Sequence, residues 1–263
     1  MKKWLILASA VCATSMSLVG CGGGGTSSGS AYDRLPAPTI RIFNLVPDNT
    51  AGLSVAVDDS VIASNIAFRG GTADFQSIND TFETDGATDI SVNDVATAAE
   101  LDRINDEFLN DSDSLIVMFG KQNYGDEDEK ALQILRIPIS RRPVAGKARL
   151  LILNGYIPSV GRDPRQINFQ TANPADPLSS LKPLFQTNNI NFGKFEGNSV
   201  LDIDAGTRLM QARDSDSDSV VVVASKTFTF VAGKIYLAIV SGQEDAADPA
   251  RRAQIDFVEL TTR

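Results

Sequence analysis

The sequence predicts an all-β protein made of two tandem antiparallel β-sandwich domains that follow a signal peptide and a flexible tether. Three observations predict this fold. The apolar runs after residue 38 are short, about four to eight residues, and rich in Val, Ile and Phe, which is typical of strands. Turn residues such as Asp58-Asp59 and Ala232-Gly233 separate the runs. The same succession of runs also occurs twice along the chain.

The first element, residues 1–20, is predicted to be a lipoprotein signal peptide. Two lysines precede a mostly apolar stretch at residues 4–18, which is too short for an ordinary transmembrane helix. The sequence Leu18-Val19-Gly20-Cys21 follows, and it resembles the lipobox of bacterial lipoproteins. A plain secretory signal with an accidental cysteine is the alternative interpretation.

The lipobox resemblance implies that the peptide is cut before Cys21 and that fatty acyl chains such as palmitate are attached to this cysteine. Two or three acyl chains anchor a protein firmly, since each buried methylene group contributes about 0.8 kcal/mol. We therefore expect the protein in the cell envelope, on the periplasmic or surface face of the outer membrane if the source is Gram-negative, because Gly22 rather than Asp follows the cysteine. Cys12 lies in the removed segment, so no disulfide is expected.

Residues 21–37 are predicted to comprise the lipidated cysteine and a tether. Residues 22–30 are glycine, serine and threonine only, and such a run cannot bury apolar surface and behaves as a flexible spacer. Pro36 and Pro38 end it. The first β-sandwich repeat is then expected at 38–142, and the second at 143–263.

Five short segments of the first repeat recur in the same order in the second. We expect Asn65 to superpose on Asn189, and Ile42 to lie near Leu150 or Leu151. The matched segments are 39–47 with 148–158, 65–68 with 189–193, 75–78 with 200–203, 113–120 with 234–242, and 132–137 with 253–258. Each repeat would hold roughly six or seven short strands, which is typical of an immunoglobulin-like sandwich.

Residues 94–109 give conflicting signals. Leu101, Ile104 and Phe108 lie at helical spacing, whereas the repeat aligns Phe108 with an evident strand around Phe228. We expect a strand near Phe108, and the structure of residues 95–101 stays open.

Several short patterns, some in the first repeat and some in the second, resemble one family. They are Arg41, Asn44, Pro47-Asp48, residues 55–58 and residues 65–68 in the first repeat, and Arg149, Asn154, residues 189–193 and Gly206-Thr207 in the second. These patterns resemble the bacterial secreted domain of unknown function 4397 family. The resemblance would cover most of residues 38–263, and it implies no catalytic residues. A Pro-rich insertion at residues 173–183 departs from the family pattern.

Composition excludes several classes of function. The formal net charge is −9, and an acidic surface repels phosphate backbones, so no nucleic-acid partner is expected. The chain has no histidine, which excludes a Ser-His-Asp triad and histidine metal sites. Chemistry based on carboxylates, lysine or tyrosine stays possible.

Two polar patterns are weak candidates for chemistry. Asp214, Asp216 and Asp218 alternate as calcium ligands can, but the run lacks the glycine and glutamate of an EF-hand, so a solvated loop is favoured. The segment Ser179-Ser180-Leu181-Lys182 contains the Ser-x-x-Lys pattern of penicillin-binding proteins without the partner motifs. We therefore assign no catalytic residue, no metal site and no cofactor.

The favoured function is a non-enzymatic binding or scaffolding module on a lipid anchor, with the membrane and an unknown envelope protein or glycan as partners. Two alternatives stay open. An envelope hydrolase would need a carboxylate pair with shifted pKa values in one pocket. A periplasmic ligand carrier would need a cavity inside or between the repeats.

Overall fold

The computed structural model describes residues 35–78, 87–123, 130–139, 143–159, 166–184, 189–215 and 221–260. The regular structure in these ranges consists of β-strands and short 3₁₀ helices. The predicted all-β class is therefore confirmed, and none of the described helices is long and apolar enough to cross a membrane. The signal peptide, Cys21 and the tether as far as residue 34 lie outside the described residues, as does the expected boundary at residue 142.

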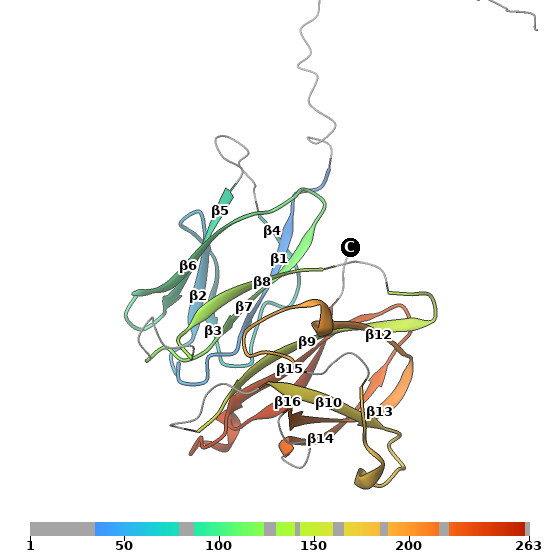
Figure 1. Ribbon diagram of the computed structural model, residues 1–263. Helices are drawn as coiled ribbons and strands as arrows, with labels where there is room; N and C mark the ends of the chain where they lie inside the picture. The colour runs from blue at the N-terminus through green and yellow to red at the C-terminus, as the bar shows by residue number, and fades with distance from the viewer. Residues whose placement is uncertain are drawn as a thin grey trace, which may run out of the picture. The chain divides into compact units, whose positions relative to one another are not determined.

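The described residues before position 140, here called the first half, form two sheets, blue to green in Figure 1. Their strands are β1 (Thr39–Asn44), β2 (Leu53–Val57), β3 (Ser60–Ile66), β4 (Gln76–Ser77), β5 (Ala87–Asp94), β6 (Glu100–Glu107), β7 (Asp113–Phe119) and β8 (Gln133–Pro138). One four-stranded sheet has the order β4-β1-β7-β8, and the other has the order β3-β2-β5-β6.

The described residues from position 143 onward, here called the second half, repeat this topology strand for strand. Their strands are β9 (Lys147–Ile157), β10 (Ile167–Ala172), β11 (Lys182–Pro183), β12 (Val200–Asp204), β13 (Gly206–Asp214), β14 (Val221–Phe230), β15 (Ile235–Gln243) and β16 (Gln254–Leu260). The sheet orders are β12-β9-β15-β16 and β11-β10-β13-β14. Adding eight to the number of a strand in the first half gives the number of the equivalent strand in the second half.

Most neighbouring strands are antiparallel, as expected, but one pair in each half is parallel. These pairs are β1 with β7 and β9 with β15. A parallel neighbour requires a long crossover connection, and here the connection between the two strands contains the whole of the second sheet of that half.

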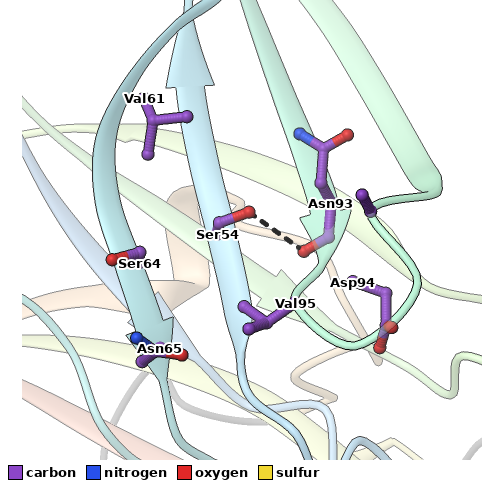
Figure 2. Close-up of a pocket in the computed structure, with 8 residues that line it drawn as sticks. Ser54, Val61, Ser64, Asn65, Asn93, Asp94 and Val95 are labelled. Atoms are coloured by element: carbon purple, nitrogen blue, oxygen red, sulfur yellow. Dashed lines mark hydrogen bonds between the residues drawn. The ribbon is translucent and has the colours of Figure 1, made fainter.

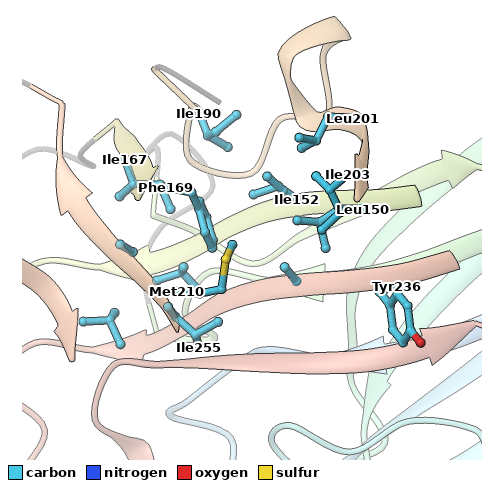
Figure 3. Close-up of a cluster of buried hydrophobic side chains, with 14 of the residues drawn as sticks. Leu150, Ile152, Ile167, Phe169, Ile190, Leu201, Ile203, Met210, Tyr236 and Ile255 are labelled. Carbon is cyan, nitrogen blue, oxygen red and sulfur yellow. The ribbon is translucent and has the colours of Figure 1, made fainter. Parts of the chain in front are cut away.

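Each half has its own apolar core between its two sheets. The cluster of the first half contains Ile42, Val55 and Ile116. That of the second half contains Ile152, Phe169 and Met210, and Figure 3 shows its side chains. Alternate residues of a regular strand point to opposite faces, so the regular strands contribute every second side chain to their core.

A third apolar cluster joins the two halves. It combines Leu115 and Val117 of β7 with Leu151 and Leu153 of β9, together with residues of β15. The sheets β4-β1-β7-β8 and β12-β9-β15-β16 therefore pack against each other with apolar faces. The space between the halves, which is one of the two places where a ligand carrier could have its cavity, contains this cluster.

A buried asparagine performs the same task in each half. The Asn44 side-chain amide donates to the Ile66 carbonyl (2.8 Å), and its oxygen accepts from the Val46 N–H (2.9 Å). Asn154 makes the equivalent bonds to Ile190 (3.0 Å) and Tyr156 (3.1 Å). Each asparagine therefore fixes the segment that follows Asn65 or Asn189.

The strand register agrees with this equivalence. Asn65 and Asn189, which the sequence matched, both have positive φ, 55° and 60°. Asn44 pairs with Met118 and Asn154 with Val240, each two residues before a glycine with positive φ. This register equates Ile42 with Ile152, so its expected position near Leu150 or Leu151 was wrong. A run of similar apolar residues can be aligned in several registers with nearly equal similarity. In addition, β9 has more residues than β1 before the asparagine.

Equivalent positions of the two halves contact each other across the interface, but the residues at these positions differ in size and polarity. The Arg69 Nε donates to the Ser241 Oγ (3.1 Å), and other guanidinium nitrogens donate to the carbonyls of Ser241, Ala250 and Arg252. The residue equivalent to Arg69 in the second half is Gly193, and it lies against Phe119, which is equivalent to Ser241. A long side chain therefore meets a small one on one side, and the arrangement is reversed on the other.

Residues Glu100–Glu107 of the disputed segment form strand β6, and Phe108 follows directly after it, close to where the repeat predicted a strand. The register of β6 with β5 shifts because Asn93 pairs with Glu100 while Val92 pairs with Asp102, so Leu101 is an extra residue, a β-bulge. The bulge brings Leu101 onto the same face as Ile104, and both pack against the core of the first half. The helical spacing thus arose from a bulge within a strand.

Replacing Gly193 with alanine should destabilise the protein by about 3 kcal/mol, since the new Cβ would overlap the Phe119 ring and the residue has a φ of 60°. The matched control is Gly233→Ala, because Gly233 has a φ of 79° and open space around it. That change should cost only about 1 kcal/mol. Urea unfolding of both variants measures the difference. Equal losses would mean that the Phe119 contact is not tight.

Candidate functional site

A hollow of about 320 Å³ lies on the first half and is here called the Val61 hollow (Figure 2). It is on the face of the sheet turned away from the core, because Leu53 and Val55 point into the core and Ser54 lies between them. It is lined by Ser54, Val61, Ser64, Asn65, Asn93, Asp94, Val95 and Ala98. Strands β2, β3 and β5 carry most of these residues.

The lining of the Val61 hollow combines apolar and hydrogen-bonding groups. Val61 is 64% exposed and Val95 is 36% exposed, so both present apolar surface in the hollow. The hydroxyl of Ser54 donates a long bond, 3.4 Å, to the Asn93 carbonyl. Figure 2 shows Ser54 on the strand between those of Ser64 and Asn93. This lining suits a ligand that has both apolar and hydroxyl surfaces.

The backbone around the Val61 hollow is held in unusual conformations. Asn65 and Ala98 have φ values of 55° and 57°, which non-glycine residues rarely adopt. The turn after β5 closes through two hydrogen bonds, from the Ala98 N–H to the Asp94 carbonyl (2.8 Å) and from the Asp94 N–H to the Ala99 carbonyl (2.9 Å). The hollow is therefore built on a fixed frame.

Asp94 anchors that frame from beneath. One carboxylate oxygen accepts from the Thr97 N–H (2.8 Å) and hydroxyl (2.9 Å). The other accepts from the side-chain amides of Asn49 (2.8 Å) and Gln122 (3.1 Å). The pKa of Asp94 is lowered, first by the Thr97 N–H and against the opposing effect of burial, with further lowering by the side chains of Thr97, Gln122 and Asn49. Asp94 is therefore ionised and its oxygens are occupied.

A second hollow, of about 340 Å³, lies on the second half and is here called the Arg208 hollow. It is lined by Thr171, Ala172, Asn173, Asp176, Ser180, Lys182 and Arg208. Each of the two hollows contains a single carboxylate, Asp94 or Asp176, so neither holds the carboxylate pair that the hydrolase alternative requires.

The predicted site residues are not brought together. Asp214 is buried at the end of β13, and Asp216 and Asp218 lie outside the described residues. Across the described ranges, no group of three or more acidic, cysteine or histidine side chains could hold a metal ion. Ser179 lies in a 3₁₀ helix, Leu178–Ser180, and Lys182 begins β11, so the Ser-x-x-Lys pattern lacks the α-helix that its chemistry uses.

Sequence reasoning missed both hollows. An exposed valine such as Val61 is common in a strand and carries no signal by itself. The available signals were the hydroxyl and amide residues that alternate with apolar ones in β2 and β5, and the Pro-rich insertion that now lines the Arg208 hollow.

No family model matches the chain, and no curated protein matches it. The solved structures that are similar to it over most of its length include the following two. A family 41 carbohydrate-binding module from streptococcal virulence factors, which recognises alpha-glucan, is 12% identical over 83% of this chain and 96% of that chain, with a TM-score of 0.24. A candidate cell adhesion protein from Bacteroides ovatus is 11% identical over 87% of this chain and 99% of that chain, with a TM-score of 0.20. These TM-scores are too low to bear on function.

The Asp94→Asn variant should be less stable than the parent protein at neutral pH, with the difference shrinking in acid. The pKa of Asp94 is lower in the folded state than its unfolded value, about 3.9. Its contribution is therefore complete above that value and is lost as the pH falls through the folded pKa. The urea unfolding midpoints of the variant and the parent protein, taken between about pH 2.5 and pH 6, measure this stability difference.

The control for this variant is Asp59→Asn, because Asp59 is 87% exposed and its φ of 61° suits asparagine equally well. This control should follow the curve of the parent protein. A constant stability difference between the Asp94→Asn variant and the parent across the pH range would contradict the anchoring role.

Proposed function

We propose that the protein is a lipid-anchored module of the cell envelope that binds a neutral glycan in the Val61 hollow and catalyses no reaction. The observation that carries the proposal is the lining of this hollow, where exposed Val61 and Val95 adjoin hydroxyl and amide side chains. A sugar ring offers apolar C–H faces together with hydroxyl groups, so it complements such a lining. Binding sites are often concave, largely apolar and supplied with a few polar groups.

The preference for a neutral ligand follows from Asp94. This is the one ionisable side chain of the hollow, and its oxygens already accept four hydrogen bonds. An anionic ligand would be repelled by it, and a cation would find its oxygens occupied. An envelope protein that presents apolar and amide groups is the alternative partner.

Lowered carboxylate pKa values favour binding over catalysis. A general acid needs a pKa raised toward the working pH. The described carboxylates with a clear shift are instead lowered, Asp94 by the Thr97 N–H, Glu100 by Arg103, Asp202 by Arg149 and Asp204 by Lys147. These groups are ionised partners in hydrogen bonds and ion pairs.

The lipid anchor is proposed from the sequence. The lysines, the short apolar stretch and Leu18-Val19-Gly20-Cys21 support it, and a glycine-rich spacer separates Cys21 from the first strand. The same segment supports an outer-membrane position in a Gram-negative source. The strand patterns also support membership of the domain of unknown function 4397 family.

Changing Val61 to aspartate should weaken glycan binding by at least about tenfold, which is 1.4 kcal/mol, because it places a charge in the apolar part of the hollow. The matched control is Val231→Asp, since Val231 is 51% exposed and is not among the residues that line the Val61 hollow. Binding is measured on an array of neutral oligosaccharides, followed by calorimetry. Retention of no neutral glycan, or equal binding by the two variants, would refute the glycan proposal.

The Cys21→Ser variant should lose membrane attachment, because the thiol is the group that carries the lipid. Membrane fractionation and intact mass of the mature protein measure this. A variant that keeps both its membrane retention and its mature mass would exclude lipidation at Cys21. The Cys12→Ser variant is the control and should remain lipidated, because Cys12 lies in the segment expected to be removed.

A further inference from the structure

The Arg208 hollow lies at one end of the second sandwich, where the inner face of the sheet continues beyond the apolar core. Thr171 pairs with Lys182 on one side and with Met210 on the other. Met210 belongs to the core, and Arg208 lies two residues before it on the same strand. Alternation therefore places Thr171, Lys182 and Arg208 on the core-facing side. Polar residues therefore occupy the core-facing side at this end of the sheet.

Two polar groups of this hollow lack partners. The Thr171 hydroxyl and the Arg208 Nε–H are buried, and neither has a hydrogen-bond partner among the described residues. An unsatisfied buried donor is costly, so each such group in a native protein calls for an explanation, and a bound ion is one of them. Both groups can donate a hydrogen bond, so an acceptor oxygen is the complement they need.

The charges around the hollow favour an anion. Asp204 Oδ1 lies 2.7 Å from the Lys147 ammonium, whereas its Oδ2 is 3.9 Å from the Arg208 Nη2, so Lys147 is the closer partner of this carboxylate. Asp176 accepts from the Asn173 N–H (3.3 Å) and side-chain amide (2.9 Å). Arg208 and Lys182 therefore retain positive charge that faces the hollow, on a chain whose net charge is −9.

We infer that the Arg208 hollow is an oxyanion site, in which Arg208, Lys182 and Thr171 hold a carboxylate or phosphate group. Arginine presents a fork of N–H donors that matches such groups, and lysine adds a point charge. This inference goes beyond the proposed function, because it concerns the other half of the chain and an anionic ligand, whereas the proposed function concerns a neutral glycan.

The remaining lining of the hollow fits an oxyanion attached to a hydroxylated body. Ser180 and Asn173 flank the cationic residues and offer neutral hydrogen-bonding groups. The volume of about 340 Å³ is at the lower end of the range for small-molecule pockets. An acidic sugar such as a hexuronate has this chemistry, and free phosphate shares its anionic part.

Calorimetry on the full-length protein with glucuronate, glucose and inorganic phosphate tests the inference. Glucuronate or phosphate should bind, glucose should not, and affinity should fall as salt rises from about 20 to about 200 mM. The Lys182→Gln variant should bind at least about tenfold more weakly, and Arg208→Gln should lose binding. Lys194→Gln is the matched control, because it removes the same charge from an exposed lysine that does not line the hollow.

The arms of this experiment separate the possible outcomes. Tighter binding of glucuronate than of phosphate supports a sugar-borne anion, and the reverse supports a free anion. Absence of binding by both anions, binding of glucose as tight as that of glucuronate, or unchanged affinity in the Lys182→Gln variant would overturn the site. The Lys182→Gln change is at an exposed position, so it tests the site even if Arg208→Gln fails to fold. The Val61→Asp variant should bind these anions normally, which separates this result from the glycan proposal.

Discussion

The apolar layer between the sheets β4-β1-β7-β8 and β12-β9-β15-β16 is the constraint on which the remaining architecture depends. These two are here called the inner sheets, and β3-β2-β5-β6 and β11-β10-β13-β14 are called the outer sheets. Strand β7 shows its consequence, because Ile116 and Met118 pack into the core of the first half while Leu115 and Val117 face the second half. A strand buried on both faces cannot alternate between apolar and polar residues, so the whole of β7 is buried. The outer sheets have one face free, and both hollows are built from their strands.

The layer also requires the halves to differ where they touch. Arg69 and Gly193 occupy equivalent positions, and so do Ser241 and Phe119. An arginine in place of Gly193 would bring its guanidinium group against the Phe119 ring. A glycine in place of Arg69 would leave the carbonyls near Ser241 without their hydrogen-bond donor. A close-packed interface tolerates neither voids nor overlaps. Each half is therefore complementary to the other half and not to a copy of itself.

Much of the fold could be predicted from residues alone, because strands, turns and the repeat each leave a local pattern. The pairing of residues 65–68 with 189–193 was visible as a shared Asn-Ile pair, and both asparagines have positive φ. The register of β9 could not be predicted, because its apolar run is uniform. The β-bulge at Leu101 produced the helical spacing that left residues 95–101 open, since inserting one residue into a period of two gives a spacing of three. The hollows depend on side chains from strands that are separated in sequence, and a local sequence pattern does not predict which of these side chains lie close together.

The two hollows lie on equivalent strands but differ in chemistry. The Val61 hollow uses β2, β3 and β5, whereas the Arg208 hollow uses β10, β11 and β13, their counterparts in the second half. The first opens on the outer face of its sheet and the second at the end of a core, where the Pro-rich insertion supplies further lining. The strands joined by the apolar layer cannot change without disturbing both halves, whereas residues on the outer sheets are free of that requirement. Differences between the repeats that matter for binding are therefore expected on the outer sheets, while the inner sheets keep the frame.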